Sequence, residues 1–228
     1  MDFQFNEDQR AIADMAGALF SDTCTDDRLR SADTRGEGFF ADLWEKCVET
    51  GLHALSIPED AGGSGLGMTD LMLVLEAQGR ALGHVPLWQH QLAAMAVARF
   101  GGAAGQDLLA EASAGEKILT LSLHGLARSG GDGLQAVAGV DGLIVTGRVP
   151  AVAFAPEAAA ALLLTATPEG NRLILVNLDQ SAVSLTPGLF TDGASEADVA
   201  VRDLVVPAAQ VFPAEAVHVR LRGAKPPC

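Results

Sequence analysis

The spacing of apolar residues changes near position 116, and this change limits what the chain can fold into. Before it, apolar side chains recur at every third or fourth position, as at Ile12, Met15 and Leu19, which is typical of one face of an α-helix. After it, short runs rich in valine, leucine and alanine alternate with turns that contain glycine, aspartate and proline, which is typical of strands without intervening helices. The sequence therefore predicts an α+β fold, with an N-terminal all-α helical domain followed by a small antiparallel β-barrel or sandwich.

Helix-forming segments occupy most of the first half. They are expected at residues 6–20, 39–50, 69–82, 87–100 and 106–112. Asn6 is a good N-cap, and Gln9 stands three positions later, as in a capping box. Residues 21–37 are polar and charged and are expected to be mainly loop, with a short helix as the alternative. Four glycines within Gly62–Gly67 exclude regular structure there, because glycine loses more backbone entropy than other residues in helices and strands.

Strands are expected throughout the second half. The apolar runs lie at residues 118–123, 134–137, 143–145, 161–165, 172–176, 183–185, 197–201 and 204–206. Asp141-Gly142 between two such runs is a strong hairpin signal. Helical spacing returns from Ala214. We therefore expect three parts, which are a helical domain at 1–116, a β-domain at 117–213 and the truncated start of a second helical domain at 214–228.

Charge and residue spacing narrow the classes of partner. Lys and Arg total 15 against 29 for Asp and Glu, a net charge of -14, so nucleic acids and anionic membrane surfaces would be repelled. The apolar windows are too short to span a bilayer, which predicts no membrane insertion. Three cysteines without C-x-x-C spacing and five histidines without metal-ligand spacing predict neither a disulfide framework nor a metal site. A reducing cytoplasm is the expected location, since no basic and apolar leader follows Met1.

Several local motifs occur in a fixed order along almost the whole chain. They are FQFNEDQR at residues 3–10, IPEDAGGSGLG at 57–67, EAQGR at 76–80, DGLIVTG at 141–147 and LVVP at 204–207. In this order they resemble the acyl-CoA dehydrogenase family. The glycine-rich segment together with the order of the others is specific, whereas any single motif would be weak.

The resemblance implies a flavoprotein of three domains, helical, β-barrel and helical, of which the third is expected here only as its truncated start at 214–228. The family desaturates an acyl-CoA thioester: a carboxylate removes the α-proton, and FAD accepts a hydride from the β-carbon. Hydrogen bonds that stabilise the enolate-like charge make the α-proton removable. The third domain usually carries the carboxylate, so no catalytic residue is assigned here. The implied partners are an acyl-CoA thioester and a homo- or hetero-oligomer with a related dehydrogenase subunit, in fatty acid or steroid degradation.

Two segments match the family's flavin-binding motifs in part. The family's ALTEPGAGSD segment corresponds to LTLSLHGLA at 119–127, and its WIT segment corresponds to residues 151–153. On this match the candidate flavin-binding residues are Leu119, Thr120, Ser122, Gly125, Ala151 and Ala153. Alanine replaces the family's tryptophan and threonine, and each lost hydrogen bond costs about 0.5–1.5 kcal/mol. FAD is therefore expected to be bound weakly or shared with a partner subunit.

Three functions remain open on the sequence. The first is an acyl-CoA dehydrogenase-like flavoprotein that is inactive as this chain alone. The second is a non-catalytic scaffold subunit of a heteromeric acyl-CoA dehydrogenase, and the third is a truncated product. Two motifs also have two interpretations each: Gly62–Gly65 is a tight loop or a phosphate cradle, and Arg148 is a surface cation or a phosphate ligand. Trp44 and Trp88 are expected in the core.

Overall fold

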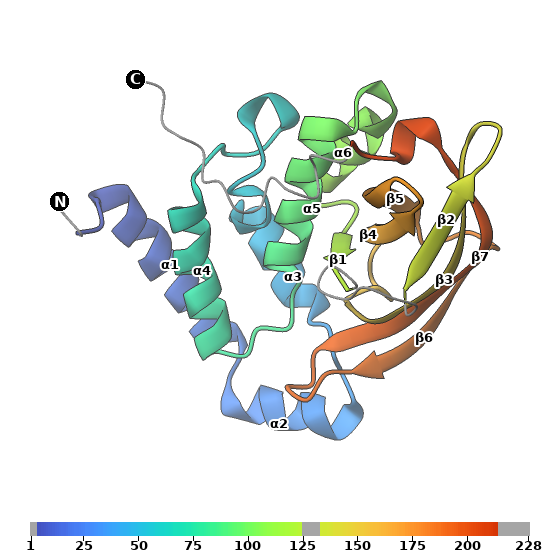
Figure 1. Ribbon diagram of the computed structural model, residues 1–228. Coiled ribbons are helices and arrows are strands. Elements are labelled where there is room, and N and C mark those ends of the chain that lie inside the picture. The colour runs from blue at the N-terminus through green and yellow to red at the C-terminus, as the bar shows by residue number, and fades with distance from the viewer. Residues whose placement is uncertain (1–3, 125–132, 214–228) are drawn as a thin grey trace.

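The computed structural model describes residues 4–124 and 133–213 and has helices on one side of the molecule and strands on the other (Figure 1). The helices are α1 (Glu7–Thr23), α2 (Asp26–Arg35), α3 (Ala41–Glu49), α4 (Met68–Arg80), α5 (Leu87–Phe100) and α6 (Gln106–Ser113). The strands are β1 (Leu119–Ser122), β2 (Leu134–Ala138), β3 (Gly142–Ala153), β4 (Ala160–Thr167), β5 (Gly170–Asn177), β6 (Val183–Leu189) and β7 (Ser195–Pro207). The predicted α+β class, helices first and sheet second, is confirmed.

Local signals explain where the helices begin. The Asn6 side chain accepts a hydrogen bond from the Gln9 N–H at 2.7 Å, and the Gln9 side chain accepts one from the Asn6 N–H at 3.2 Å. The predicted capping box is therefore confirmed. The bounds expected for α5 are also confirmed, since this helix begins directly after Pro86. Within residues 4–124 and 133–213, no helix is long and apolar enough to cross a membrane.

Helix α2 lies in the segment that the sequence analysis assigns mainly to loop, and the structure corrects this assignment. The Thr25 hydroxyl accepts a hydrogen bond from the Arg28 N–H at 3.4 Å, and Gly36 ends the helix in the left-handed conformation. Among the residues of α2 only Ala32 is buried. The helix therefore has no apolar stripe, and its sequence signals are the caps and the charges that complement the helix dipole.

The seven strands form one mixed sheet that is open. Its hydrogen-bonded order is β1-β4-β2-β3-β7-β6, and β5 pairs with β4 outside this path. The β1–β4 and β2–β4 pairs are parallel, whereas β2–β3, β3–β7, β4–β5 and β6–β7 are antiparallel. The strand arrangement thus differs from the expected antiparallel barrel, because β1 and β2 run in the same direction along one edge of β4 while β5 occupies the other. Strand β6 is an outer strand that contains Pro187.

Strands β3 and β7 are longer than their apolar runs indicate. The expected run at 143–145 extends through Ala153, and the runs at 197–201 and 204–206 join into one strand. The β3–β7 register shifts between Val145 and Gly147 and again between Val149 and Val152. Such shifts are β-bulges, which bend a long strand and redirect its side chains. The second bulge contains Ala151, so it shapes one of the predicted flavin segments.

Two buried apolar clusters fill the interior, and each draws on both halves of the chain. The first cluster contains, among others, Phe20, Trp44, Val149 and Val199. The second cluster contains, among others, Val97, Leu109, Leu119, Leu162 and Phe212. Since burial of apolar surface is the main stabilising term in folding, the position of the sheet depends on the helices packed against it.

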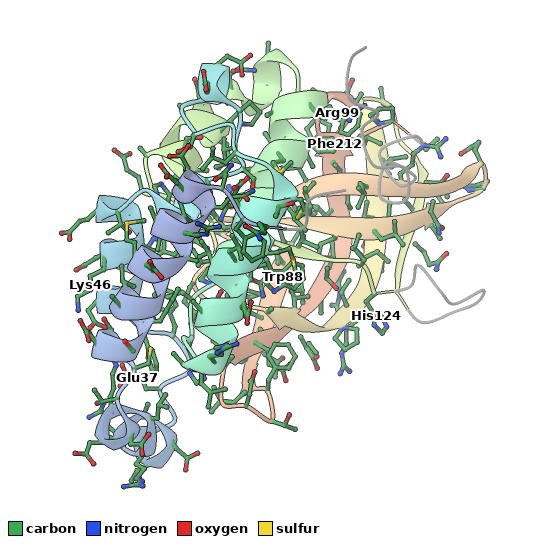
Figure 2. The ribbon with its side chains drawn as sticks, turned by 90° about the vertical axis from the view of Figure 1, so that its left-hand side faces the viewer. Glu37, Lys46, Trp88, Arg99, His124 and Phe212 are labelled. Atoms are coloured by element: carbon green, nitrogen blue, oxygen red, sulfur yellow. The ribbon has the colours of Figure 1, made fainter. Side chains whose placement is uncertain are left out.

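Trp88 is not a core residue, although the sequence analysis expects it to be one. Its side chain is 40% exposed, whereas Trp44 is buried as expected. The neighbours Leu87, Gln89 and His90 occupy the buried side of α5. In Figure 2, Trp88 lies where the helices meet the sheet. Apolar residues occur on more than one face of α5, so the sequence alone does not show which of them is exposed.

The glycine-rich loop between α3 and α4 is held by its own backbone. The Gly63 N–H donates to the Pro58 carbonyl at 3.0 Å, and the Gly65 N–H donates to the Ile57 carbonyl at 2.8 Å. These amides are therefore engaged inside the loop and are not directed at a ligand. The contacts favour the tight-loop interpretation over the phosphate cradle. A Cβ atom on Gly63 would lie 2.1 Å from the Ile57 carbonyl oxygen, so this position requires glycine.

We expect Gly63→Ala to lower the free energy of unfolding by about 1–3 kcal/mol, because overpacking forces the backbone to shift. Urea unfolding measures the change. The matched control is Gly79→Ala on α4, where an added Cβ meets nothing within 4 Å and alanine is the better helix former. Equal stability of the two variants would contradict the close approach at Gly63.

Candidate functional site

Strand β1 and the end of β3 bring the two predicted flavin segments together. The Thr120 hydroxyl donates a hydrogen bond to the Ala153 carbonyl at 2.5 Å. Thr120 and Leu119 are both fully buried. The hydroxyl proton of Thr120 is therefore committed to the protein, and only the oxygen lone pairs could accept from a ligand.

The other candidate residues lie around this contact. Ser122 ends β1, and its hydroxyl oxygen accepts a hydrogen bond from the His124 N–H at 3.3 Å; His124 lies beside the sheet in Figure 2. Gly125 lies outside the described residues. Ala151 is exposed and Ala153 is half-buried. Since neither alanine has a polar side chain, only their backbone groups can form hydrogen bonds with a ligand.

The bulge in β3 is strained and is fixed from β7. Ala151 and Phe154 both have left-handed backbone conformations, with φ of 51° and 52°, which cost about 1–3 kcal/mol each for residues other than glycine. The Ala151 N–H donates to Asp198 Oδ1 at 3.0 Å, and the Phe154 N–H donates to the Ser195 carbonyl at 2.9 Å. These bonds hold the segment in one conformation without a ligand.

Arg148 is paired within the protein. Its guanidinium donates to Asp198 Oδ2 at 2.5 Å, and its side chain is 64% exposed. The Asp198 carboxylate thus accepts two hydrogen bonds, one at Oδ1 from the Ala151 N–H of the bulge and one at Oδ2 from the Arg148 guanidinium. This pairing favours the surface-cation interpretation of Arg148 over the phosphate ligand.

Glu157 is a half-buried carboxylate beside the bulge. The Ser195 hydroxyl lies 2.9 Å from both Oε1 and Oε2 of Glu157 and donates its single proton to one of them. Burial raises the pKa of Glu157 above its ordinary value of 4.5, and the hydrogen bond from Ser195 opposes part of this rise. Glu157 has no ion-pair partner among the described residues. Its carboxylate therefore accepts a hydrogen bond from Ser195 in a partly buried position.

The helices contact this region directly. The Ser195 N–H donates to the Gly38 carbonyl, in the connection between α2 and α3, at 2.8 Å. A Cβ atom on Gly38 would lie 2.7 Å from that same nitrogen, so the approach requires glycine. At β1, the Leu119 N–H donates to His90 Nδ1 of α5 at 3.1 Å. One end of the candidate site is thus bonded to the α2–α3 connection, and the other is bonded to helix α5.

Two hollows in the described part of the chain lie away from these residues. One, of about 560 Å³, lies between α1 and α4 and includes Gly17, Cys24 and Ala77. The other, of about 370 Å³, lies between Gly62 and Ser113. Across residues 4–124 and 133–213, no three histidines, cysteines or acidic residues are arranged to hold a metal ion. Thr120, Ala151 and Ala153 line neither hollow.

Sequence reasoning missed three polar residues that shape the site, Asp198, Glu157 and Ser195. Each forms its contact with a partner that is 38 or more positions away in the chain, so no local motif reveals it. The available signal was alternation along β7, where Asp198 interrupts an otherwise apolar run. The contact of His90 with the Leu119 N–H joins residues 29 positions apart, so no local motif reveals it either.

Comparison with known proteins identifies the family. A family model described as "Acyl-CoA dehydrogenase, N-terminal domain" matches residues 6–116. The chain is 32% identical over 195 residues to acyl-CoA dehydrogenase FadE27 of Mycobacterium tuberculosis, an alignment that covers 85% of this chain and 52% of that protein. The chain belongs to the acyl-CoA dehydrogenase family. It spans about half the length of the curated relatives it matches.

Solved acyl-CoA dehydrogenase structures have the same fold. The ChsE4–ChsE5 complex from Mycobacterium tuberculosis matches with a TM-score of 0.88 and 29% identity over 96% of this chain and 60% of that chain. A variant of the Tcur3481–Tcur3483 steroid ACAD matches with a TM-score of 0.82 and 31% identity over 92% of this chain and 58% of that chain. A glutaryl-CoA dehydrogenase with FADH2, at 16% identity and a TM-score of 0.80, shares the fold.

Glu157 makes stability depend on pH in a defined direction. Because its pKa is raised in the folded state, its contribution is fully present below the ordinary pKa and is lost as pH rises through the folded pKa. We expect Glu157→Gln, which keeps an acceptor for Ser195, to gain stability over the wild-type chain as pH rises from 4 to 7. Urea unfolding across this range measures the difference. The exposed Glu45→Gln is the control, and an identical pH trend in both variants would contradict this role for Glu157.

Proposed function

We propose that this chain is one subunit of a heteromeric, FAD-dependent acyl-CoA dehydrogenase that desaturates an acyl-CoA thioester between its α and β carbons, and that it is inactive alone. The observation that carries the proposal is an acyl-CoA dehydrogenase fold in which alanine stands at the family's tryptophan and threonine positions, 151 and 153, and in which the Thr120 hydroxyl donates to the Ala153 carbonyl. The similarity to two structures whose titles name paired proteins supports a related partner subunit.

In this proposal β1 and β3 form one wall of a shared flavin site. FAD, when bound, supplies the acceptor for the hydride that leaves the β-carbon. Asp198 and Thr120 hold the backbone of Ala151 and Ala153, and these two alanines would line the cofactor. In this proposal the base that removes the α-proton belongs to the partner, because no residue of this sequence matches the family's catalytic carboxylate.

We propose a bulky steroid acyl-CoA as the substrate class. The neighbour at 31% identity is named a steroid ACAD, and this supports a steroid thioester over a straight fatty acyl chain. We also propose a cytoplasmic location, because Cys24 and Cys47 are free thiols, which fits a reducing compartment.

A second candidate is a purely structural subunit that makes no contact with FAD. It is supported by the engagement of the Thr120 hydroxyl with Ala153 rather than with open space. In that case the partner holds the complete flavin site, and this chain supplies only packing surface.

Purification of the chain alone, of a related partner subunit alone, and of the two together tests the proposal. Visible absorbance measures flavin, size-exclusion chromatography measures assembly, and an artificial electron acceptor reports acyl-CoA oxidation. We expect flavin and activity only in the assembly, with a steroid acyl-CoA favoured over a fatty acyl-CoA. Oxidation of acyl-CoA by this chain alone would overturn the proposal. Equal flavin content and activity in the partner alone would favour the structural subunit.

Restoring a hydroxyl at the family's threonine position is expected to tighten FAD binding. Ala153→Thr adds one hydrogen-bonding group, worth about 0.5–1.5 kcal/mol, so the Kd for FAD in the assembly should fall by about 2- to 12-fold. Fluorescence titration of the apo-assembly with FAD measures this Kd. Ala138→Thr, an exposed position on β2, is the matched control. An unchanged Kd in both variants would exclude Ala153 from the flavin site.

A further inference from the structure

The Leu119 N–H points away from the sheet and needs a partner. The Ala159 N–H donates to the Ile118 carbonyl at 2.8 Å, so Ile118 directs its backbone groups at the β4 side. Because backbone groups alternate along a strand, Leu119 directs its own in the opposite direction. Leu119 is fully buried, and an unpaired buried N–H costs about 1–3 kcal/mol.

His90 supplies that partner from helix α5. Its Nδ1 accepts the Leu119 N–H at 3.1 Å, and the imidazole is fully buried. Nδ1 can accept only in the tautomer that carries its proton on Nε2. Burial, with a smaller effect of His53, lowers the pKa of His90 to about 3. The ring therefore stays neutral and keeps its acceptor throughout the physiological pH range.

The ring of His90 is held in one orientation by its neighbours. The indole of Trp44 packs edge-on with 5.1 Å between ring centroids, and the ring of His53 lies at 6.1 Å. His53 itself bonds elsewhere, through Nε2 to the Ser113 carbonyl of α6 at 2.9 Å. The two buried histidines thus belong to one cluster, but only His90 bonds to the sheet.

The bond from His90 continues into the candidate site. Leu119 immediately precedes Thr120, whose hydroxyl bonds the Ala153 carbonyl at 2.5 Å. We propose that His90 is a positioning residue that sets the position of β1 against α5, and through Thr120 sets the backbone of β3 that faces FAD. The part of this inference that concerns FAD rests on the proposed function, whereas the part that concerns β1 does not.

Two substitutions at His90 separate the hydrogen bond from packing. His90→Leu fills space without an acceptor, and His90→Asn offers a side-chain oxygen in place of Nδ1. His53→Leu is the matched control, because it removes a buried ring from the same cluster without touching β1. Urea unfolding reports the stability of each variant.

Hydrogen exchange of the Leu119 amide in the full chain tests the bond without reference to flavin. We expect His90→Leu to speed this exchange by about tenfold relative to amides in the middle of α5, a loss of about one hydrogen bond. His90→Asn should restore most of the protection, and His53→Leu should leave the ratio unchanged. Unchanged exchange in His90→Leu, or the same acceleration in His53→Leu, would overturn the inference.

The Kd of the assembled complex for FAD tests the link to the site. We expect a Kd about tenfold higher for His90→Leu, near the wild-type value for His90→Asn, and unchanged for His53→Leu. An unchanged Kd in His90→Leu would overturn the link to flavin. A wild-type assembly that binds no FAD would instead overturn the proposed function, and the exchange measurement would still decide the role of His90 at β1.

Discussion

The helices and the sheet have no separate interiors, and the rest of the structure depends on this shared packing. Each of the two buried apolar clusters contains side chains from both halves of the chain. Polar contacts between the halves are few but specific, such as Ser195 with Gly38 and Leu119 with His90. The apolar clusters supply the stability, and these bonds define where the strands lie. A change in a helix far from β3 can therefore alter the candidate site.

Much of the fold could be predicted from local patterns. The capping box at Asn6 and the bounds of α5 follow from residues that are neighbours in the chain. The parallel pairing of β1 with β4 could not be predicted, because it depends on contacts between residues about forty positions apart, and such contacts leave no periodic signal. Helix α2 could not be placed from the sequence for a different reason. It buries only Ala32, so its sequence has no amphipathic spacing.

The candidate site, too, could be predicted only in part from the sequence. The resemblance indicated residues 119–122 and 151–153, and the structure joins these segments through Thr120 and Ala153. The resemblance did not indicate Asp198, which holds Ala151 in a conformation that alanine rarely adopts. The candidate site therefore combines a strained backbone that Asp198 fixes with alanine at two of its positions. This combination fits a subunit whose task is to shape a site that another chain completes.

The open edge of the sheet has a consequence for solubility during synthesis. An outer strand offers unpaired amides and carbonyls on which a second chain could add a strand and begin a fibre. In β6 this row is interrupted by Pro187, which has no amide hydrogen to offer, and Gly188 follows it. The strand can thus complete the sheet through β7 while presenting a poor template to other copies. Replacement of this proline would add an amide hydrogen to the outer strand and would make β6 a better template for polymerisation.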